Sequence, residues 1–259
     1  MIHFPTNVID NFCDNPDEVV KMAQSDKIEW HKHESGNWPG MRSQALHVLD
    51  KEFWANMIKK YLNVFWTNDE MNSQDIRFEA SSFFQRISSE YTNGWIHSDF
   101  PDVHTMILYL TPNADPKSGT AIYMPRNINT QVKHTDIKQS YYRGEISKAE
   151  QQPYLEEHNK GFIEDCFFAN KYNRQIGFDS RLWHGVKEFD TNTKEERLTI
   201  VTFIYLFIKY NGLPSRRHNG VRTTFSDRYN FIIIFDREFG ERWQLIKVKT
   251  KAQTITIIV

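Results

Sequence analysis

The sequence has little of what marks secreted, membrane-spanning or nucleic-acid-binding proteins. Two cysteines in 259 residues are too few for a disulfide framework and are typical of a reducing compartment. The formal net charge of −1 gives no global attraction to nucleic acid or to an anionic membrane. The sequence begins without the basic residues and apolar stretch of a secretory signal. Its longest apolar run, residues 198–208, is about half as long as a membrane crossing needs. We therefore expect a cytoplasmic protein with no nucleic-acid or membrane partner.

The composition permits one sizeable core. Hydrophobic residues make up 39% of the chain, so residues 1–259 are expected to form a single domain with elaborations. Within residues 1–75, Asn15, Pro16 and the acids that follow are typical of a helix start. Residues 53–62 have the apolar spacing of a second helix. We expect this N-terminal segment to be a helical buttress for a sheet.

From residue 76 onward the pattern becomes that of β-strands. Apolar or alternating runs cover residues 77–87, 103–110, 120–124, 175–179 and 198–208. No helices are regularly interposed between these runs, which favours a sandwich or barrel over a parallel α/β sheet. The fold class that we predict is mainly β with flanking helices, and its core is expected over residues 76–208.

Two segments interrupt or extend this core. Residues 126–172 are polar and too long for a simple connection, so they are expected to be an insertion, either a lid or a local subdomain. Residues 209–259 form a basic C-terminal extension, because residues 209–251 contain ten Lys/Arg and four Asp/Glu. This excess of positive charge fits either a solvated hairpin or a tail that contacts the body of the protein or a partner.

Candidate metal ligands come first from a His-x-Asp pattern. It occurs twice, as His97-Ser98-Asp99 and as His134-Thr135-Asp136, and it is weak evidence without a structural setting. The second copy lies in the polar insertion with no apolar strand beside it, so we interpret it as surface. The first copy precedes the apolar run 103–110, and side chains two positions apart on extended backbone project to the same side. His97 and Asp99 could therefore face one metal ion, or they could simply share a local turn hydrogen bond.

Three further residues strengthen the metal hypothesis. His184 lies at the end of a predicted strand, and Arg197 follows thirteen positions later, immediately before the run 198–208. Two histidines and one carboxylate form a facial triad, which holds a divalent metal and leaves coordination positions open. Arg197, with Thr199 on the same face of its strand, could anchor an anionic cosubstrate by a two-pronged contact. The alternative for Arg197 is a surface arginine at a strand end.

Taken in this order, the segments resemble the iron(II)- and 2-oxoglutarate-dependent dioxygenases, and most closely their prolyl-hydroxylase-like branch. The resemblance covers residues 78–208 and rests on five pieces, Ile96–Asp99, Leu108–Pro112, Lys117–Ala121, Trp183–Gly185 and Arg197–Thr199. It implies a double-stranded β-helix, which is a cupin-like jelly roll. It also implies that His97, Asp99 and His184 hold Fe(II), that Arg197 and Thr199 bind 2-oxoglutarate, and that no further catalytic residue is needed.

The sequence departs from that branch in one respect. The branch often has a tyrosine shortly before the first histidine that touches the cosubstrate, where this chain has Ile87 and Ser88. Whether Arg86 or Gln85 takes its place is left open by the sequence.

The activity implied by the resemblance is hydroxylation of a C–H bond in a small-molecule or peptidyl substrate. The reaction consumes O2 and releases succinate and carbon dioxide. Two alternatives stay open: a cupin-like metalloenzyme of another class, such as an isomerase or a zinc hydrolase, and a jelly-roll binding module without catalysis. The substrate and the oligomeric state cannot be read from the sequence, because a fold and a metal site do not set specificity.

Overall fold

The computed structural model describes residues 5–65, 67, 69, 76–91, 93–99, 104–189, 196–209, 217–218, 221–225, 232–235, 248–249 and 254–255. By its internal contacts the chain divides into two compact units. The first comprises residues 1–58 and 79–206, and the second comprises residues 59–78 and 207–259. The first unit carries the candidate site.

Two sheets build the first unit. The larger sheet has six strands in the spatial order β1 (Asn7–Ile9), β7 (Gln175–Asp179), β4 (His104–Tyr109), β9 (Arg197–Lys209), β3 (Ile76–Ile87) and β2 (Met41–Arg42). The smaller sheet has three strands in the order β6 (Phe162–Phe168), β5 (Thr120–Pro125) and β8 (Trp183–Val186). Every pairing with a described register is antiparallel. All five strands predicted from apolar runs are therefore confirmed as strands.

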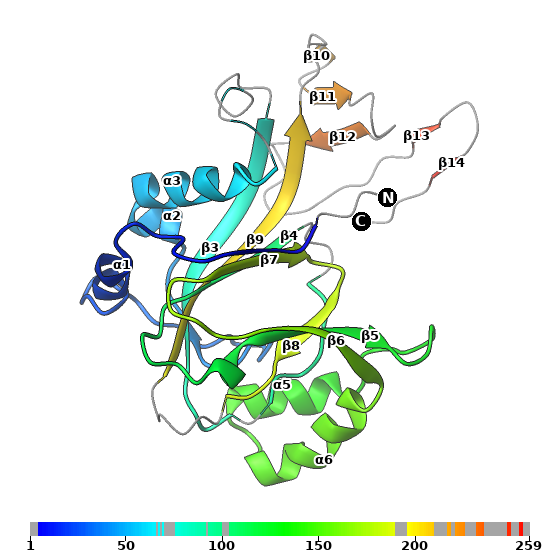
Figure 1. The fold of residues 1–259 in the computed structure, drawn as a ribbon. Coiled ribbons are helices and arrows are strands. Elements are labelled where there is room, and N and C mark those ends of the chain that lie inside the picture. Colours follow the sequence, from blue (N-terminus) through cyan, green and yellow to red (C-terminus); the bar gives the residue numbers. More distant parts are fainter. Residues whose placement is uncertain are drawn as a thin grey trace. The chain divides into compact units, whose positions relative to one another are not determined.

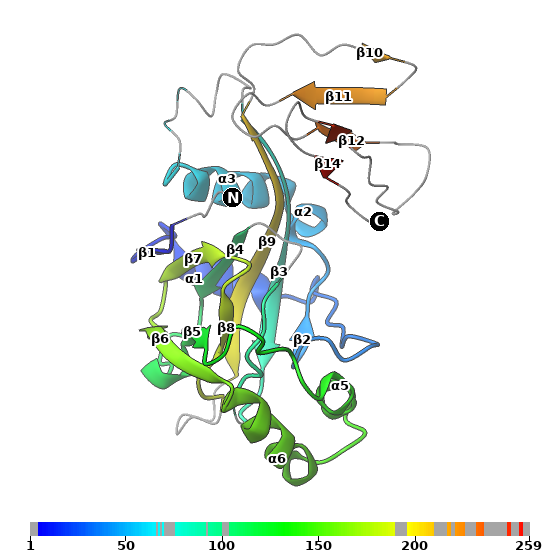
Figure 2. The same ribbon diagram turned by 90° about the vertical axis from the view of Figure 1, so that its right-hand side faces the viewer.

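Successive strands alternate between the two sheets. The chain passes from β3 in the larger sheet to His97, which pairs with His184 of β8 in the smaller one, and then returns to the larger sheet in β4. Strands β5 and β6 follow in the smaller sheet, and β7, β8 and β9 alternate again. Two facing antiparallel sheets joined in this way are the arrangement of a jelly roll, as Figures 1 and 2 show.

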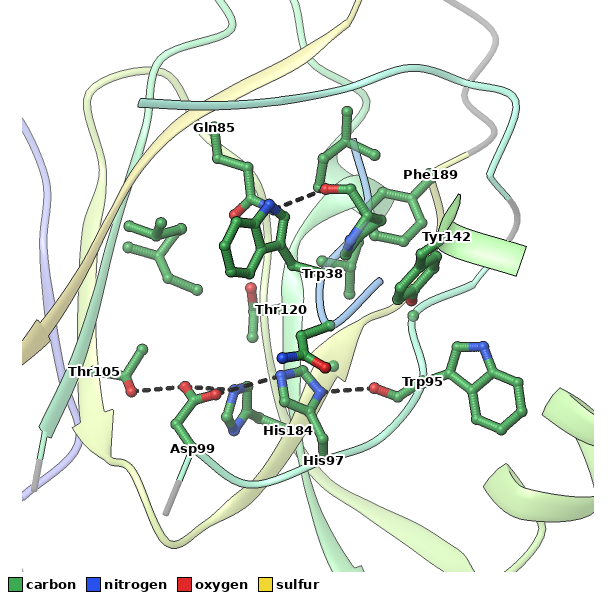
Figure 3. A pocket seen from close by; sticks show the side chains of 18 of the residues that line it. Trp38, Gln85, Trp95, His97, Asp99, Thr105, Thr120, Tyr142, His184 and Phe189 are labelled. Carbon is green, nitrogen blue, oxygen red and sulfur yellow. Dashed lines mark hydrogen bonds and ion pairs between the residues drawn. The ribbon is translucent and has the colours of Figure 1, made fainter. Parts of the chain in front are cut away.

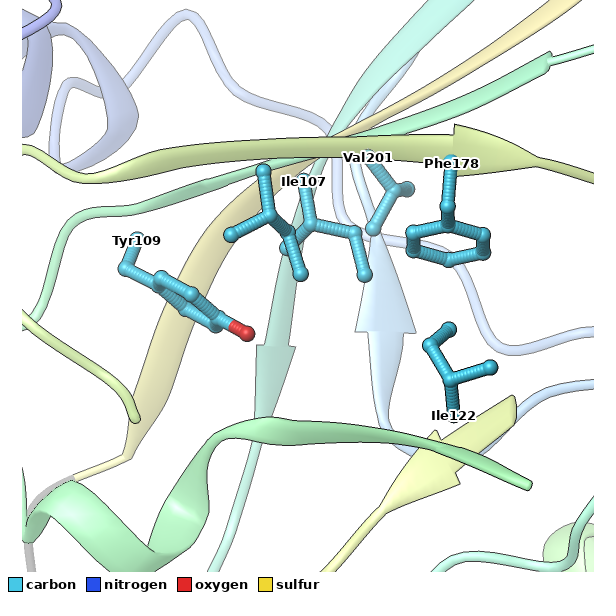
Figure 4. Packing of buried hydrophobic residues seen from close by; sticks show 6 residues of the cluster. Ile107, Tyr109, Ile122, Phe178 and Val201 are labelled. Carbon is cyan, nitrogen blue, oxygen red and sulfur yellow. The ribbon is translucent and has the colours of Figure 1, made fainter. Parts of the chain in front are cut away.

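The hydrophobic core lies between these sheets. Ile107 of β4 is the register partner of Ile176 on β7 and of Val201 on β9, so three branched side chains form a row across the larger sheet. Phe178 lies beside this row, and Ile122 of β5 contacts the cluster from the smaller sheet (Figure 4). Burying such side chains contributes roughly 1.5–3 kcal/mol each. This contact between the sheets lies beside the space into which the site residues project.

The N-terminal helices begin as the sequence predicts. Helix α1 (Pro16–Ala23) has proline in its first turn followed by Asp17 and Glu18, and α3 (Lys51–Leu62) includes the whole predicted second helix. The short helix α2 (Leu46–Leu49) lies between them. That these helices buttress the sheet stays a prediction.

The interval 126–172 contains two helices and a strand. Helices α5 (Thr135–Arg143) and α6 (Lys148–Asn159) pack on each other, and β6 follows as a full member of the smaller sheet (Figure 1). Helix α6 begins with a capping box, since Ser147 and Glu150 bond each other's backbone. Tyr142 and Leu155 pack against Trp95. The helical pair is therefore attached to the chain segment that leads into His97.

The second unit is described only in part. It contains β10 (Arg217–His218), β11 (Val221–Phe225) and β12 (Ile232–Phe235) in one antiparallel sheet, and β13 (Val248–Lys249) with β14 (Thr254–Ile255) in another. Most of the predicted basic extension 209–259 lies outside the described residues. Among the helices that are described, none has the length and apolar composition that a membrane crossing requires.

Candidate metal centre

Two histidines far apart in the sequence are paired across the smaller sheet. The backbone N–H of His97 donates to the carbonyl oxygen of His184 at 2.9 Å, and the N–H of His184 donates to that of His97 at 2.8 Å. Residues that exchange both bonds in an antiparallel pair project their side chains from the same face. The two imidazole centroids consequently lie 4.4 Å apart.

Asp99 completes the group from two residues further along. Its backbone N–H donates to the carbonyl oxygen of Ser180 at 2.8 Å, which fixes the turn leading out of the His97 segment. One carboxylate oxygen lies 3.5 Å from Nε2 of His97 and the other lies 3.2 Å from Nε2 of His184. The three ligand atoms offered by these side chains all lie within 4.8 Å of one another. Figure 3 shows the three groups converging on one point of the pocket.

Both imidazoles are oriented by their other nitrogen. Nδ1 of His97 lies 2.8 Å from the carbonyl oxygen of Trp95, and Nδ1 of His184 lies 2.9 Å from that of Leu182. A carbonyl oxygen only accepts, so each Nδ1 must carry its proton and donate it. The lone pair of a neutral imidazole is then on Nε2, the atom that faces Asp99. This is the tautomer that metal-binding histidines commonly use.

The Asp99 carboxylate is held by a buried chain of hydroxyls. Thr105 Oγ1 donates to Asp99 Oδ2 at 2.8 Å and lies 2.9 Å from Ser180 Oγ. The single Thr105 proton is used on Asp99, so Ser180 donates to Thr105. Thr105 and Ser180 are almost completely buried, and this support fixes the direction of the carboxylate.

The three groups perturb one another's protonation. Burial disfavours the charged form of Asp99, but the two imidazoles and the Thr105 hydroxyl outweigh it and hold the pKa of this carboxyl well below its usual range. Burial also opposes charge on His184, yet the charge and hydrogen bond of Asp99 raise the pKa of this imidazole. Burial and the positive charges of His184 and Lys138 lower the pKa of His97. At neutral pH the site therefore presents a carboxylate, a neutral imidazole and an imidazole that holds its proton more tightly than usual.

A cavity adjoins the triad on the face where its ligand atoms converge. Its volume is about 90 Å³, enough for several water-sized groups. Its apolar and aromatic walls include Trp38, Trp95, Ile107, Tyr142, Phe189 and Val201. Figure 3 shows Trp38, Tyr142 and Phe189 on the walls of this pocket. A charged group placed here is screened from bulk water, so its interactions are strengthened.

Arg197 enters the same cavity from the larger sheet. Its side chain is almost fully buried, and its Nε donates to the carbonyl oxygen of Ser118 at 2.9 Å. The guanidinium carbon lies 5.3 Å from the centre of the Tyr109 ring. Nη2, however, has no hydrogen-bond partner, and no carboxylate among the described residues lies within ion-pair distance of this arginine. Burial lowers the pKa of Arg197, and an uncompensated buried cation of this kind strongly favours an anionic ligand.

A model of a protein family of unknown function, DUF6445, matches residues 3–204. The chain belongs to this family. The match includes all three triad residues and Arg197, so the site described above lies within the part of the chain that defines the family. None of the curated proteins compared with the sequence matches it significantly.

Several solved structures are similar to this chain at low sequence identity. A prolyl 4-hydroxylase from Phytophthora capsici is 15% identical over 77% of this chain and 58% of its own, with a TM-score of 0.42. A prolyl-4-hydroxylase from Pseudomonas putida is 13% identical over 77% of this chain and 91% of its own, with a TM-score of 0.43. HygX from Streptomyces hygroscopicus, with nickel and 2-oxoglutarate bound, is 11% identical over 77% of this chain and 82% of its own, with a TM-score of 0.44. This chain thus spans less than two thirds of the Phytophthora protein, and similarity of this degree does not transfer an activity.

The other residues considered for cosubstrate binding, Thr199, Gln85 and Arg86, lie in different places in this DUF6445 member. Thr199 is fully buried, its hydroxyl is 3.5 Å from the carbonyl oxygen of Gln85, and it does not line the cavity. Gln85 does line the cavity. Arg86 points away from it, with its guanidinium carbon 4.4 Å from the centre of the Trp30 ring. Neighbouring positions on a strand project to opposite faces, which separates Gln85 from Arg86.

The second His-x-Asp pattern is not part of a metal-ligand cluster. His134 precedes helix α5, and its Nε2 lies 3.1 Å from Glu157. In the described part of the chain, the group of His97, Asp99 and His184 is the single set of three residues close enough to share an ion.

The polar residues of the cavity that sequence reasoning missed include Arg42, Thr105 and Lys138. Thr105 carried a signal, because it is a polar residue inside the apolar run 103–110. Arg42 and Lys138 carried none. One lies in a two-residue strand and the other on a polar helix, and neither sequence context distinguishes them from surface residues.

Proposed function

We propose that this protein is an Fe(II)- and 2-oxoglutarate-dependent oxygenase that hydroxylates a C–H bond of its substrate. One observation carries the proposal: the converged ligand atoms of His97, Asp99 and His184 share a cavity with the unpartnered Nη2 of the buried Arg197. A metal triad alone suits several enzyme classes. A triad next to a buried guanidinium that lacks an anion suits an enzyme with a metal and an anionic cosubstrate.

The donor set fits ferrous iron. Two imidazole nitrogens and one carboxylate oxygen on one side of the ion are the ligand type of non-haem iron oxygenases, and they leave positions open on the other side. The Nε2 atoms of His97 and His184 and a carboxylate oxygen of Asp99 are the atoms that would hold the metal. When bound, iron and 2-oxoglutarate would supply the oxidising chemistry, with O2 consumed and succinate and carbon dioxide released.

The surroundings of Arg197 fit the far carboxylate of 2-oxoglutarate. Its Nε is already directed by Ser118, so the guanidinium plane is fixed before any ligand arrives. Nη2 supplies the free donor, and a buried charge-assisted hydrogen bond to a carboxylate contributes about 1.5–3 kcal/mol. Thr120, which lines the cavity, accepts a hydrogen bond from Tyr109 at 2.9 Å and so adds polar surface nearby. For Thr199, a direct contact with the cosubstrate stays a prediction.

The rest of the cavity would hold the substrate and exclude water. Helix α5 contributes Tyr142 to its lining, and the loop before β2 contributes Trp38. These two segments are joined where Gln139 Nε2 donates to Asn37 Oδ1 at 3.0 Å. We infer that the helical pair α5–α6 acts as the cover of the site, because closing an oxidising site against water suppresses side reactions.

The test is metal binding and 2-oxoglutarate turnover by purified protein and two matched variants. His184→Ala removes a proposed ligand, whereas His134→Ala removes the histidine of the second His-x-Asp pattern, which is bonded to Glu157. We expect wild type and His134→Ala to bind one Fe(II) and to form succinate from 2-oxoglutarate in air. His184→Ala should do neither.

Succinate release by His184→Ala at the wild-type rate would contradict the proposal. Metal binding without any effect of 2-oxoglutarate on the thermal midpoint would favour a cupin-like metalloenzyme of another class. Absence of metal binding in the wild type would favour a binding module.

A further inference from the structure

The candidate cavity contains two cations that the proposed function does not use. Arg42 and Lys138 both line it, together with Arg197 and the single carboxylate of Asp99. Arg42 comes from β2 of the larger sheet and Lys138 from helix α5. Two elements distant in the sequence therefore deliver positive charge to one space beside the proposed metal.

Arg42 is surrounded by rings and has no anionic partner in the part of the chain that the structure describes. Its guanidinium carbon lies 4.1 Å from the centre of the Trp38 ring and 5.1 Å from that of Phe203, an arrangement that holds the plane of the group by cation–π contact. Its Nε has no hydrogen-bond partner, and no described carboxylate lies within ion-pair distance. Burial lowers the pKa of Arg42 to about 10, against the opposing charges of Asp99 and Tyr205. The guanidinium therefore stays charged at neutral pH.

Lys138 projects into the cavity from the same face of α5 as Tyr142, since the two are four positions apart on the helix. Its ammonium lies 5.9 Å from the centre of the Tyr142 ring. No described residue makes an ion pair with it. Burial lowers the pKa of Lys138, and the charge of Asp99 opposes that shift. A half-buried ammonium that has no counterion among the described residues responds in this way.

The charges of the loaded site would not balance without a further anion. This step rests on the proposed function. The two positive charges of Fe(II) and the one of Arg197 would be offset by Asp99 and by the two carboxylates of 2-oxoglutarate. Arg42 and Lys138 would then remain as two uncompensated positive charges in a cavity with largely apolar walls. Buried cations are retained where a ligand supplies the opposite charge.

We propose that the substrate is a small organic anion whose carboxylate or phosphate group binds between Arg42 and Lys138, with an apolar body that lies against the aromatic wall of the cavity. A fixed guanidinium can contact two oxygens of either group at once, and an ammonium adds a point charge. Tyr142, Phe189 and Phe203 provide the apolar surface beside the charges. Arg42 and Trp38 also line an open groove that contains His31, Lys32 and His33. The anionic end would therefore lie where the cavity meets this groove.

The test is calorimetric binding of three probes to protein saturated with Fe(II) and 2-oxoglutarate in the absence of oxygen. The probes are 3-phenylpropionate, phenyl phosphate and the neutral 3-phenylpropanamide. The variants are Arg42→Met and Lys138→Met, and Arg42→Lys serves as the charge-preserving variant. The matched controls are Arg126→Met and Lys133→Met, which remove exposed cations. Arg126 donates to the carbonyl oxygen of Lys160, and Lys133 forms an ion pair with Glu157.

We expect Arg42→Met and Lys138→Met each to lower the affinity for the anionic probes by about 10-fold or more, because each variant loses one charge-assisted hydrogen bond. The controls should retain the full affinity, and Arg42→Lys, which keeps the charge but loses the contact with two oxygens, should bind with an affinity between those of the wild type and Arg42→Met. The amide should bind at least about 10-fold more weakly than 3-phenylpropionate. The affinity for 2-oxoglutarate itself should not change in Arg42→Met or Lys138→Met. The ratio between the two anionic probes then assigns a carboxylate or a phosphate to the substrate.

The inference would be overturned if neither anionic probe bound, if the probe that binds did not depend on Arg42 and Lys138, or if the amide bound as tightly as 3-phenylpropionate. If Arg42→Met does not fold, Lys138→Met carries the same comparison. Parallel titrations without Fe(II) and 2-oxoglutarate separate the two proposals. Probe binding that depends on these cations in a protein that binds no metal would reject the oxygenase and keep the anion site. Binding of metal and 2-oxoglutarate without probe binding would keep the oxygenase and reject the anion site.

Discussion

His97 and His184 are hydrogen-bonded partners in an antiparallel pair, and their imidazole centroids lie 4.4 Å apart. The geometry of the candidate metal centre is therefore set by the register of the bridge between the His97 segment and β8. A slip of one residue would turn one imidazole to the opposite face. Asp99 then needs only one further constraint, its bond to the backbone of Ser180, to meet both rings.

The hydroxyl behind Asp99 should tune metal affinity. Thr105→Val keeps the shape of the side chain but removes the bond to Asp99 Oδ2, and it leaves Ser180 without its acceptor. We expect Fe(II) or Mn(II) affinity to fall by about 10- to 100-fold, as for other groups that orient a metal ligand. Thr202→Val is the matched control, because that buried hydroxyl bonds Ser82 instead. Equal metal affinity in the two variants, measured by calorimetry, would refute the orienting role of Thr105.

Metal binding should release one proton and weaken as the pH falls. Asp99 raises the pKa of His184 above 6.5 even though burial opposes it, and a metal ligand must be the neutral imidazole. Below that pKa the metal competes with a proton, so the apparent affinity should drop about tenfold per pH unit. His97 and Asp99, whose pKa values are lowered, should not add to this slope between pH 5 and 8. Titrations in buffers of different ionisation enthalpy count the protons, and a flat profile over this range would contradict the expectation.

In the metal-free protein, the buried charge of Arg197 should lower the free energy of unfolding. Binding of 2-oxoglutarate should offset that loss. Replacing a buried unpaired cation by an apolar residue is often neutral or stabilising, so Arg197→Leu should leave the thermal midpoint unchanged or raise it. The same change should weaken 2-oxoglutarate binding by about 30- to 100-fold. Arg174→Leu gives the contrast, because Arg174 has a partner in Asp10 at 2.7 Å. That variant should lose at most about 1 kcal/mol of stability and keep its cosubstrate affinity. A large loss of stability in Arg197→Leu would instead mark this arginine as structural.

Gly119 and Gly185, the two glycines in the segments that resemble the dioxygenases, should differ in how much stability their replacement by alanine costs. A Cβ on Gly119 would lie 2.0 Å from the carbonyl oxygen of Phe168 and 2.7 Å from the backbone nitrogen of Asn170. A Cβ on Gly185 would meet backbone atoms of Trp95 and Ile96 at 3.4–3.6 Å, which are ordinary contacts. Gly119→Ala should therefore cost about 1–3 kcal/mol, whereas Gly185→Ala should be neutral or stabilise by about 0.4–1 kcal/mol. Denaturant unfolding compares the two variants, and the reverse order would contradict the packing described for this turn.

The strands and the His-x-Asp pattern of the site could be recognised in the sequence because both are formed by residues close together in the chain. Runs of alternating or apolar residues are formed by neighbours in the chain, and the segments 103–110, 120–124 and 175–179 are strands as expected. The choice of His97 over His134 also followed from local context, namely the apolar run beside one and the polar stretch around the other. The same reasoning interpreted the interval 126–172 as an insertion, either a lid or a local subdomain, and it did not anticipate that β6 completes the smaller sheet.

The two further cations of the cavity were not accessible from sequence. Arg42 faces it because β2 pairs with β3 so that Arg42 lies opposite Gln85, and Lys138 faces it because α5 is tied to the loop of Asn37. Thr199 shows the converse. It shares a face with Arg197 by strand periodicity, yet its hydroxyl is directed at the carbonyl oxygen of Gln85.

The sequence by itself indicated five of the strands, the start of helix α1 and the short list of side chains able to bind a metal, because propensity and spacing act between near neighbours. Only the tertiary structure decided which of those side chains meet. The distance between His97 and His184 depends on the register of their pairing, and Arg197, Arg42 and Lys138 lack an ion-pair partner among the described residues because the fold places the described carboxylates out of reach. Coulomb and hydrogen-bond energies are set by distance in space and by exclusion of water, and neither quantity exists until the two sheets have closed around the cavity.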